Sequence, residues 1–335
     1  MCHNIDMDFK KYALVDLHLH LDGSLSPEVI IEVAKEENIE LPTYEANELR
    51  KYLEVPLDCA SLNEYLTRFT IPNLVLQTKN GLRKCMLDLL KREAEAGLKY
   101  VEVRMAPQLS CAKGLDQDTV VSALIKASED GFKKYHIKSN LILCMMRNNN
   151  NVFENMKTIE VAAKYLNKGV VAIDLAGAEA LYPNEIFSSF FDAIRGHKIP
   201  MTIHAGEAAG YQSVQSAIKA GAVRIGHGIH AIEDEAVMNM LFTEKIPLEI
   251  CPKSNLDTKA IDKLENLPIR EFMKRGVIVT LNTDDMTVSN TWLEKEYALL
   301  HTVGYSDEEL KQIAINTINS AFISKKEKEE LIKLL

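Results

Sequence analysis

Eight short apolar segments recur along this chain, and nearly every one runs directly into polar residues. Segments with helical periodicity separate them, and several of these close with a glycine, where a left-handed C-cap costs little. Strands and helices that alternate about every 30 residues indicate βαβ units and a parallel sheet. The expected strands cover residues 15–22, 100–105, 140–146, 170–175, 201–204, 224–227, 248–250 and 278–281. The expected helices include 119–135, 153–166, 184–197, 211–220, 233–245 and 268–275.

Eight βα units fit a closed barrel, whereas an open doubly wound sheet is the default for any βα alternation. In a barrel the carboxyl ends of all strands converge at one mouth, which accounts for polar residues at nearly every strand end. The chain also lacks the G-x-G-x-x-G and Walker patterns of nucleotide-binding open sheets. We therefore expect an α/β fold, a (β/α)8 TIM barrel in one domain over residues 1–335, with extra helices in residues 292–335.

One connection, residues 23–99, is far too long for a single crossover helix. Ser26 and Pro27 fit the N-cap and first position of one helix, and Ser61 with Glu64 has the pattern of a capping box that opens another. We expect this segment to form a helical, lid-like insertion in the barrel.

The helix expected after Ser61 carries an apolar stripe at i, i+3, i+4 and i+7. Its members are Leu62, Tyr65, Leu66 and Phe69. Such a stripe is most simply part of the core. Because its segment leaves the strand that carries two histidines, the stripe could equally wall a pocket, so the four side chains are candidate substrate contacts.

The composition narrows the partners and the cell compartment. A net charge of −9, from 39 basic and 48 acidic residues, argues against nucleic acid or an anionic membrane as the main partner. The six cysteines include no C-x-x-C pair and favour reduced core thiols. The amino-terminal residues lack a signal-peptide pattern, and no stretch approaches about 18 consecutive apolar residues. We expect a cytoplasmic protein, monomeric or weakly homo-oligomeric, that acts on a small molecule.

The first apolar segment alternates strictly, so that Asp16, His18, His20 and Asp22 share one face of the expected strand. Two imidazoles on one face of a strand form half of a metal site. The competing interpretation is a half-buried strand whose exposed polar face carries histidines by chance.

Three other expected strands end in residues of the same chemistry, and a barrel brings them to the same mouth. These residues are His204, Glu207, His227, Asp284 and Asp285. A divalent metal, most plausibly zinc, takes about four or five nitrogen and oxygen ligands, one of them water in a catalytic site. His18, His20 and His204, together with one aspartate, meet that requirement.

The chain resembles the adenosine deaminase family of the metal-dependent amidohydrolase superfamily, which includes adenosine and AMP deaminases. The matching motifs are His18-Leu-His20-Leu-Asp22-Gly-Ser, Ser61-Leu-Asn-Glu-Tyr-Leu-Thr-Arg-Phe69, Asp174-Leu-Ala-Gly177-Ala-Glu179, His204-Ala-Gly-Glu207-Ala, Arg224-Ile-Gly-His227-Gly and Asn282-Thr-Asp284-Asp285. They occur in family order and cover the whole barrel.

The resemblance implies a role for each matched residue. One zinc would be held by His18, His20, His204 and Asp284. Catalysis on substrate and water would fall to Glu207, His227 and Asp285. The nucleoside would contact His20, Asp22, Gly177 and Asp285.

These roles agree with the chemistry of the reaction. Zinc lowers the pKa of coordinated water from near 16 toward about 7, so that hydroxide is available to attack C6 of the purine. The attack puts negative charge on N1, and a protonated Glu207 is the natural donor. Asp285 could meet N7 only as a neutral acid or through a shared proton, while Gly177 N–H would meet N3 and Asp22 a ribose hydroxyl.

Each of these residues also has a purely structural interpretation. Glu207 could be a surface acid in the first turn of a helix. His227 could be a fourth nitrogen ligand or a core histidine bonded to backbone. Gly177 could serve only as a turn glycine, and Asp22 could merely end the first strand.

Several further residues bear on the prediction of the site. Met286 stands where the family would lead us to expect proline, which leaves the shape of that loop open. Arg104 and Arg147 are expected to form structural ion pairs. Among the other histidines, surface or helical positions are expected for His3, His136, His197 and His301, whereas His230 lies too close to His227 to dismiss.

The expected activity is zinc-dependent hydrolytic deamination of adenosine and 2′-deoxyadenosine to inosine and 2′-deoxyinosine, with release of ammonia, as in purine salvage. Within enzymes the alternative is a deaminase of adenine or another 6-aminopurine. Outside enzymes it is a nucleoside-binding barrel that has lost its chemistry.

Overall fold

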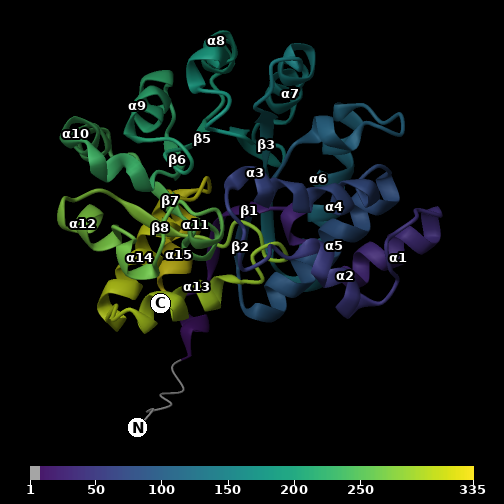
Figure 1. Ribbon diagram of the computed structural model, residues 1–335, viewed down its shortest axis with the longest axis horizontal. Coiled ribbons are helices and arrows are strands. Elements are labelled where there is room, and N and C mark those ends of the chain that lie inside the picture. Colours follow the sequence, from purple (N-terminus) through teal and green to yellow (C-terminus); the bar gives the residue numbers. More distant parts are fainter. Residues whose placement is uncertain (1–7) are drawn as a thin grey trace.

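The computed structural model of the protein describes residues 8–335, and its centre is a ring of parallel strands (Figure 1). The strands are β1 (Val15–His20), β2 (Tyr100–Met105), β3 (Lys138–Met146), β4 (Val170–Ala176), β5 (Thr202–Ala205), β6 (Arg224–His227), β7 (Leu248–Ile250) and β8 (Val279–Leu281). The expected strands are confirmed to within two residues at each end. Their short β-branched and apolar runs are buried on both faces, as in other parallel sheets.

Two four-stranded sheets close into one barrel. Their orders are β1-β2-β3-β4 and β5-β6-β7-β8. Parallel bridges join them, between Ile173 and Met201 on one side and between Leu19 and Asp284 on the other. The (β/α)8 prediction is therefore confirmed, and the open doubly wound sheet is excluded.

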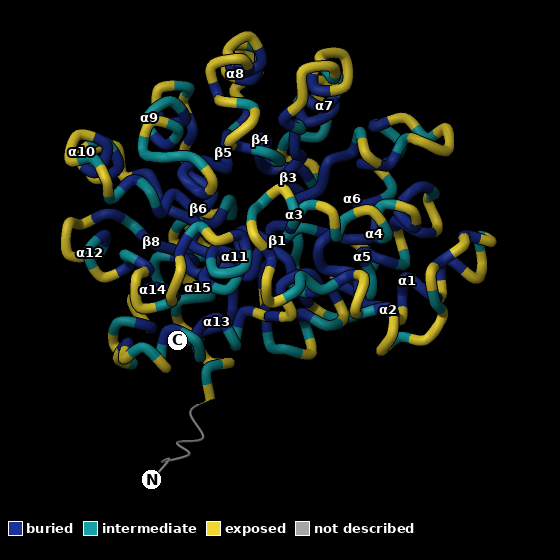
Figure 2. The backbone as a smooth tube through the Cα atoms, viewed as in Figure 1, coloured by how far each residue is buried: buried dark blue, intermediate teal, exposed yellow. Residues whose placement is uncertain are grey.

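Helices surround the strands, and buried residues concentrate at the centre (Figure 2). After β2 these helices are α6 (Gln117–Tyr135), α7 (Val152–Tyr165), α8 (Ser188–Gly196), α9 (Tyr211–Ala220), α10 (Glu235–Glu244), α11 (Pro252–Asp257) and α12 (Ile269–Lys274). Left-handed glycines precede four strands as predicted, for example Gly97 at φ 108°. The expected helix at 184–197 starts instead as a 3-10 turn, η5 (Asn184–Phe187), before α8 begins.

Besides the short 3-10 turn η2 (Asp22–Ser24), six helical pieces lie between β1 and β2. They are α1 (Pro27–Glu37), α2 (Ala46–Leu53), α3 (Leu62–Tyr65), η3 (Leu66–Phe69), α4 (Thr70–Val75) and α5 (Lys79–Ala96). Ser26 caps α1, with Pro27 at its first position, as predicted. In Figure 1, α3 and α4 are drawn over the strands near the centre of the view.

The single helix expected after Ser61 is wrong, because the segment is broken into α3, η3 and α4. The hydroxyl of Thr67 donates to the carbonyl of Glu64, and that of Thr70 donates to the carbonyl of Thr67. Such local side-chain bonds compete with the regular helical pattern. The Glu64 carboxylate accepts from the N–H of Ala60 rather than from that of Ser61, so the capping box is only half formed.

Three helices follow β8, namely α13 (Leu293–Thr302), α14 (Asp307–Ser320) and α15 (Lys325–Ile332). Ser306 and Ser324 each form a complete capping box at the predicted helix starts. Ile318 of α14 packs with Leu14 and Leu17 and thereby covers the amino-terminal end of β1. Among residues 8–335, no helix has the length and apolar character needed to cross a membrane.

Candidate active site

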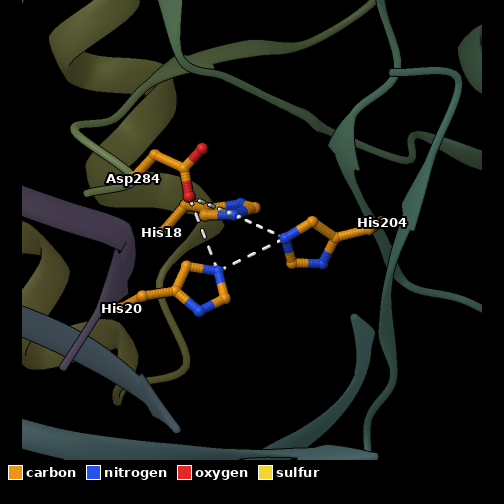
Figure 3. A group of neighbouring side chains, drawn as sticks. All are labelled: His18, His20, His204 and Asp284. Carbon is orange, nitrogen blue, oxygen red and sulfur yellow. Dashed lines mark hydrogen bonds and ion pairs between the residues drawn. The ribbon is translucent and has the colours of Figure 1, made fainter. Parts of the chain in front are cut away.

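Three histidines and one aspartate meet at the carboxyl ends of the strands (Figure 3). Nε2 of His204 lies 3.1 Å from Nε2 of His18 and 3.3 Å from Nε2 of His20. Oδ1 of Asp284 lies 3.4 Å from Nε2 of His18 and 3.5 Å from Nε2 of His20. One donor atom from each of the four residues lies within 4.8 Å of the others. The donors come from β1, β5 and the turn after β8.

Backbone hydrogen bonds between β1 and the turn after β8 place Asp284 beside the histidines. The Asp284 N–H donates to the carbonyl of His18 at 2.7 Å, and its own carbonyl accepts from the N–H of His20 at 2.8 Å. Asp284 has a left-handed φ of 68°, a conformation that a non-glycine residue keeps only where its surroundings impose it. This turn lets both Asp284 and Asp285 face the same cavity, although the two are adjacent in the chain.

The ring nitrogens of the histidines are arranged to bind a cation. Nδ1 of His18 lies 2.8 Å from a Glu249 oxygen, and Nδ1 of His204 lies 2.8 Å from an Asp174 oxygen. When Nδ1 donates its proton to such a carboxylate, Nε2 of the same ring has a lone pair available for a metal. Two lone pairs that face each other at 3.1 Å repel unless a cation lies between them. The donor set therefore fits a divalent metal.

The carboxylates that contact His18 and His204 belong to a buried network of ion pairs. Arg104 pairs with Asp174 at 3.0 Å and also with Glu249, while Nε of Arg224 lies 2.6 Å from the other Glu249 oxygen. Although burial opposes ionisation, Arg104 and Arg224 hold the pKa of Glu249 well below its ordinary value. The ion-pairing role predicted for Arg104 is confirmed. Glu249, which lies inside β7, was not predicted.

Glu207 follows β5 and is only 4% exposed, which excludes a surface acid at this position. Its Oε2 lies 3.6 Å from Nε2 of His227. Burial, together with the nearby carboxylates of Asp284 and Glu179, raises the pKa of Glu207 to about 8. The side chain therefore holds a proton at neutral pH and can donate it.

His227 ends β6 in a left-handed conformation, with φ 59°. The side-chain amide of Asn255 in α11 donates to Nδ1 of His227 at 3.0 Å, so the proton of the neutral ring is on Nε2. Burial lowers the pKa of His227 well below its ordinary value, which keeps the ring neutral. Asn255 was not predicted, although its place just after the seventh strand was a usable signal.

Asp285 is held from the insertion. Tyr65 OH donates to Oδ2 of Asp285 at 2.9 Å and lies 2.8 Å from Oγ of Ser289. The other carboxyl oxygen, Oδ1, is buried without a hydrogen-bond partner in the described residues. Burial and the nearby carboxylates of Asp284 and Asp22 raise the pKa of Asp285 well above its ordinary value, which favours a neutral acid.

A cavity of ≈ 270 Å³ opens in front of these groups. It is lined by His20, Asp22, Leu62, Tyr65, Leu66, Phe69, Thr70, Asn73, Ala106, Leu109, Cys144, Met146, Ala176, Gly177, His204, Glu207, His227, Ser254, Asp284 and Asp285. All four members of the apolar stripe are among them. Tyr65 is also buried in a small apolar cluster with Cys59 and Val288, against which Leu62 and Phe69 pack, so these stripe residues both pack together and wall the cavity. The lining, which lies wholly within the described part of the chain, includes no lysine or arginine.

Two further candidate substrate contacts lie at this cavity, in local structures that differ from each other. Asp22 belongs to the 3-10 turn η2 (Asp22–Ser24) and not to β1, so its expected place on the strand face is wrong. Its Oδ1 is buried without a partner in the described residues, and burial raises its pKa to about 6. Gly177 follows β4 at φ 105°, a conformation that favours glycine.

The remaining polar residues of the sequence analysis lie outside the cavity lining. Nδ1 of His230 lies 2.7 Å from a Glu233 oxygen, and His3 is outside the described residues. The ion pair expected for Arg147 is wrong, because its guanidinium donates to the carbonyls of Tyr182 and His204 and to the side-chain oxygen of Asn184. Tyr182 and Asn184 follow β4 and His204 lies in β5, and the strand pattern does not predict that their oxygens meet at Arg147.

The loop after β8 carries Met286 where the family pattern suggests proline. The backbone N–H of Met286 donates to Oγ of Ser24 at 3.0 Å, a bond that proline has no N–H to form. The loop after β8 is therefore tied to η2 by this residue.

Comparisons with known proteins agree on one family. A family model described as adenosine deaminase matches residues 13–335. An adenosine deaminase of Haemophilus ducreyi is 47% identical over 327 residues, which are 96% of this chain and 95% of that protein. An adenosine deaminase of Clostridium botulinum strain 657 is 40% identical, over 98% of this chain and 100% of its own.

Solved structures share the fold. The crystal structure of an adenine deaminase from Arthrobacter aurescens has a TM-score of 0.87 and 28% identity, over 96% of this chain and 97% of that one. An Arabidopsis N6-mAMP deaminase has a TM-score of 0.82 and 23% identity, over 97% of this chain and 98% of its own. At that identity the second likeness concerns the fold alone.

Proposed function

This chain belongs to the adenosine deaminase family, and we propose on that premise that it deaminates adenosine and 2′-deoxyadenosine hydrolytically, giving inosine or 2′-deoxyinosine and ammonia. One observation carries the proposal. Buried Glu207, which retains its proton, faces a cavity whose lining includes His20, His204 and Asp284, three members of the metal-binding group. That pairing supplies a proton donor next to a metal-binding group, which hydrolytic removal of an amine requires.

We propose zinc as the metal, held by His18, His20, His204 and Asp284. Three imidazole nitrogens and one carboxylate oxygen form a donor set that suits zinc and leaves a position for water. A divalent metal in such a site lowers the pKa of coordinated water toward neutrality and so supplies the nucleophile. The buried carboxylates of Glu249 and Asp174 orient His18 and His204 through their Nδ1 atoms.

Glu207 is the proposed proton donor to N1 of the purine. Addition at C6 breaks the aromatic ring and moves negative charge onto N1, so a proton delivered there stabilises the transition state more than the ground state. The raised pKa of Glu207, about 8, supports this role at neutral pH. The Nε2–H of His227 is the proposed donor that orients the attacking oxygen.

Three residues are proposed to hold the nucleoside. Asp285, kept neutral by its surroundings, donates to N7, and the N–H of Gly177 donates to N3. Asp22 accepts from a ribose hydroxyl through its unpartnered Oδ1. All three residues line the cavity, and the side chains of Asp22 and Asp285 are buried there.

The insertion at 23–99 is proposed to act as the lid of this single barrel domain. Leu62, Tyr65, Leu66 and Phe69 line the cavity and would cover the purine with apolar surface, which excludes water from the reacting atoms. His20 is proposed to contact the substrate on the opposite wall.

Location and assembly are part of the same proposal. We propose a cytoplasmic enzyme that is monomeric or weakly homo-oligomeric. The free thiols of Cys59, Cys85, Cys144 and Cys251 are buried in the described structure, which is compatible with a reducing compartment.

Adenine and nucleotides are the competing substrates. The solved adenine deaminase makes the free base a specific alternative, and the unpartnered Asp22 oxygen favours a substrate that carries a ribose hydroxyl. The cavity lining bears four carboxylates and no lysine or arginine, which disfavours a phosphate group.

The decisive experiment combines metal analysis with a deamination panel followed by ultraviolet absorbance. We expect about one zinc per chain and preference for adenosine and 2′-deoxyadenosine over adenine, AMP and 5′-methylthioadenosine. Preference for adenine would overturn the substrate assignment and leave the site intact.

A matched substitution tests the chemistry itself. Glu207→Gln removes the transferable proton, and we expect a loss of kcat of about 10²–10⁴-fold with zinc content unchanged. Glu185→Gln, an exposed change in the segment before α8, is the control. Unchanged turnover in Glu207→Gln would contradict the mechanism and favour a different proton donor, while no turnover in the wild type would indicate a binding protein.

A further inference from the structure

Glu179 lies outside the proposed chemistry, yet its carboxylate is one of the most heavily bonded groups near the site. It is 2% exposed and accepts hydrogen bonds from four consecutive backbone N–H groups. The donors are Gly206 at 2.6 Å, Glu207 at 3.1 Å, Ala208 at 2.7 Å and Ala209 at 3.1 Å.

The loop after β5 is shaped to surround an anion. Gly206 has a left-handed φ of 70°, and this turn directs the following N–H groups toward one point. Successive N–H groups in such a turn form a concave anion site. A Cβ at Gly206 would lie 2.5 Å from Cγ2 of Val214, so a larger residue at this position would have to displace Val214 or the loop. The chain fills this site with its own carboxylate.

Glu179 connects the two loops that the proposed function places on the same edge of the purine. It lies two residues after Gly177, the proposed donor to N3. It also holds the N–H of Glu207, the proposed donor to N1, whose side chain extends to within 3.6 Å of Nε2 of His227. Because N1 and N3 belong to one ring, their protein partners must keep a fixed relative position.

We propose that Glu179 is a positioning residue for the deamination, whose carboxylate fixes the backbone of Glu207 relative to Gly177. The inference rests on the proposed function, since it assigns Glu179 an effect on the proton donor. Glu179 is not part of the cavity lining, and the proposed role depends on the loop that it binds.

Glu179→Ala is the first test, because it leaves the four N–H groups around an empty anion site. A displacement of about 1 Å at the reacting atoms costs on the order of 100-fold in rate. We therefore expect kcat for adenosine to fall about 100-fold, with KM changed by less than about 3-fold, since the ribose contact at Asp22 is untouched. A rise in KM with unchanged kcat would overturn the proposal.

Formate is the second test, because it can occupy the site that the substitution empties. We expect formate at tens of millimolar to restore at least a tenth of the wild-type kcat to Glu179→Ala. Formate should leave Glu207→Gln and the control Glu185→Gln unchanged. Failure of formate to raise kcat in a folded Glu179→Ala protein would overturn the positioning role.

Folding and function can be separated in the same experiment. Thermal unfolding reports formate binding without turnover, and we expect formate to raise the midpoint of Glu179→Ala but not that of the wild type. If Glu179→Ala does not fold, Glu179→Gln replaces it, because the amide keeps one acceptor oxygen; kcat should still fall, and wild-type kcat in this variant would overturn the proposal. A wild type that binds but does not deaminate adenosine would instead overturn the proposed function.

Discussion

Glu207 keeps its proton because the fold buries it near other carboxylates, and both effects disfavour its ionised form. Burial comes first, and the carboxylates of Asp284 and Glu179 add repulsion, so that the pKa rises to about 8. A positively charged side chain at this place would have the opposite effect and remove the donor. At the residue scale, the proposed chemistry therefore depends on the burial of Glu207 and on the carboxylates placed around it.

The pH dependence of kcat/KM follows from this pKa. Glu207 acts as an acid, so the active form is present below its pKa and is lost as pH rises through about 8. We expect a plateau near neutrality and an alkaline limb close to pH 8 in initial-rate measurements with adenosine. Glu296, a second buried glutamate whose pKa is raised to about 8, lies outside the cavity lining. Glu296→Gln should keep the limb, and its disappearance in that variant would assign the limb to the wrong residue.

Asp285 gives a second prediction at the residue scale. In its proposed role Asp285 donates to N7 as a neutral acid, and an asparagine amide can donate in the same direction whereas alanine cannot. We expect Asp285→Asn to lose less kcat/KM than Asp285→Ala, by about 10-fold or more, as the loss of one hydrogen bond in a buried site implies. Steady-state assays of both variants measure this difference. Equal losses would mean that Asp285 acts only as a charge or a spacer.

Residue identities were easier to predict than residue roles. His18, His20 and His204 share a chemistry that stands out at strand ends, so pattern alone predicted that they would meet near an aspartate. The choice of Asp284 came from the family resemblance. Glu249 was missed because nothing local marks it, whereas Asn255 was missed although it lies just after the seventh strand. The importance of both comes from contacts of β7 and α11 with residues of other strands. Ion-pair partners are equally hard to predict from the local sequence, as the wrong expectation for Arg147 shows.

At the scale of elements, short turns after strands hold the reactive groups. The turn η2 after β1 passes so close to Asp285 that a Cβ on Gly23 would lie 1.6 Å from Oδ1 of Asp285. The carbonyl of Gly23 also accepts from the N–H groups of Thr287 and Val288 at 3.0 and 3.2 Å. Because glycine has no Cβ, the two loops can approach each other this closely at Gly23.

Gly23→Ala should therefore displace Asp285 and lower kcat/KM by about 100-fold, the typical effect of about 1 Å of misplacement. Gly196 is the matched control, since nothing lies within 4 Å of a Cβ added there. Gly196→Ala lies in α8 and should raise stability by about 0.5–1 kcal/mol while leaving activity unchanged. Steady-state rates and thermal unfolding of the two variants provide the comparison. Wild-type activity in Gly23→Ala would show that the turn adapts without moving Asp285.

Strands were predicted more accurately than the insertion for a physical reason. Buried parallel strands need compact apolar runs, so β2, β6 and β7 have the expected bounds. In the segment from Leu62 to Val75, threonine hydroxyls and packing over the cavity decide where helical turns break. Such contacts are set by the finished barrel, and the local pattern does not contain them.

At the scale of the molecule, the metal-binding group spans both halves of the barrel. His18 and His20 lie in the sheet β1 to β4, while His204 lies in the sheet β5 to β8 and Asp284 just after it. Isolated bridges at Ile173 and Leu19 and a few backbone bonds join the sheet edges, and buried ion pairs such as Arg104 with Glu249 also connect the two sheets. A bound ion would add a further link between the two sheets.

Removal of the metal should reduce both turnover and stability. A ligand that binds only the folded state at about 1,000 times its Kd stabilises it by about 4 kcal/mol. We expect a chelated protein to lose deaminase activity and to unfold several degrees lower, with both properties restored by added zinc. His204→Ala should behave like the chelated protein, whereas His197→Ala, an exposed change after α8, should behave like the wild type. Equal unfolding temperatures of the metal-free and zinc-loaded proteins would show that the two sheets hold together without the ion.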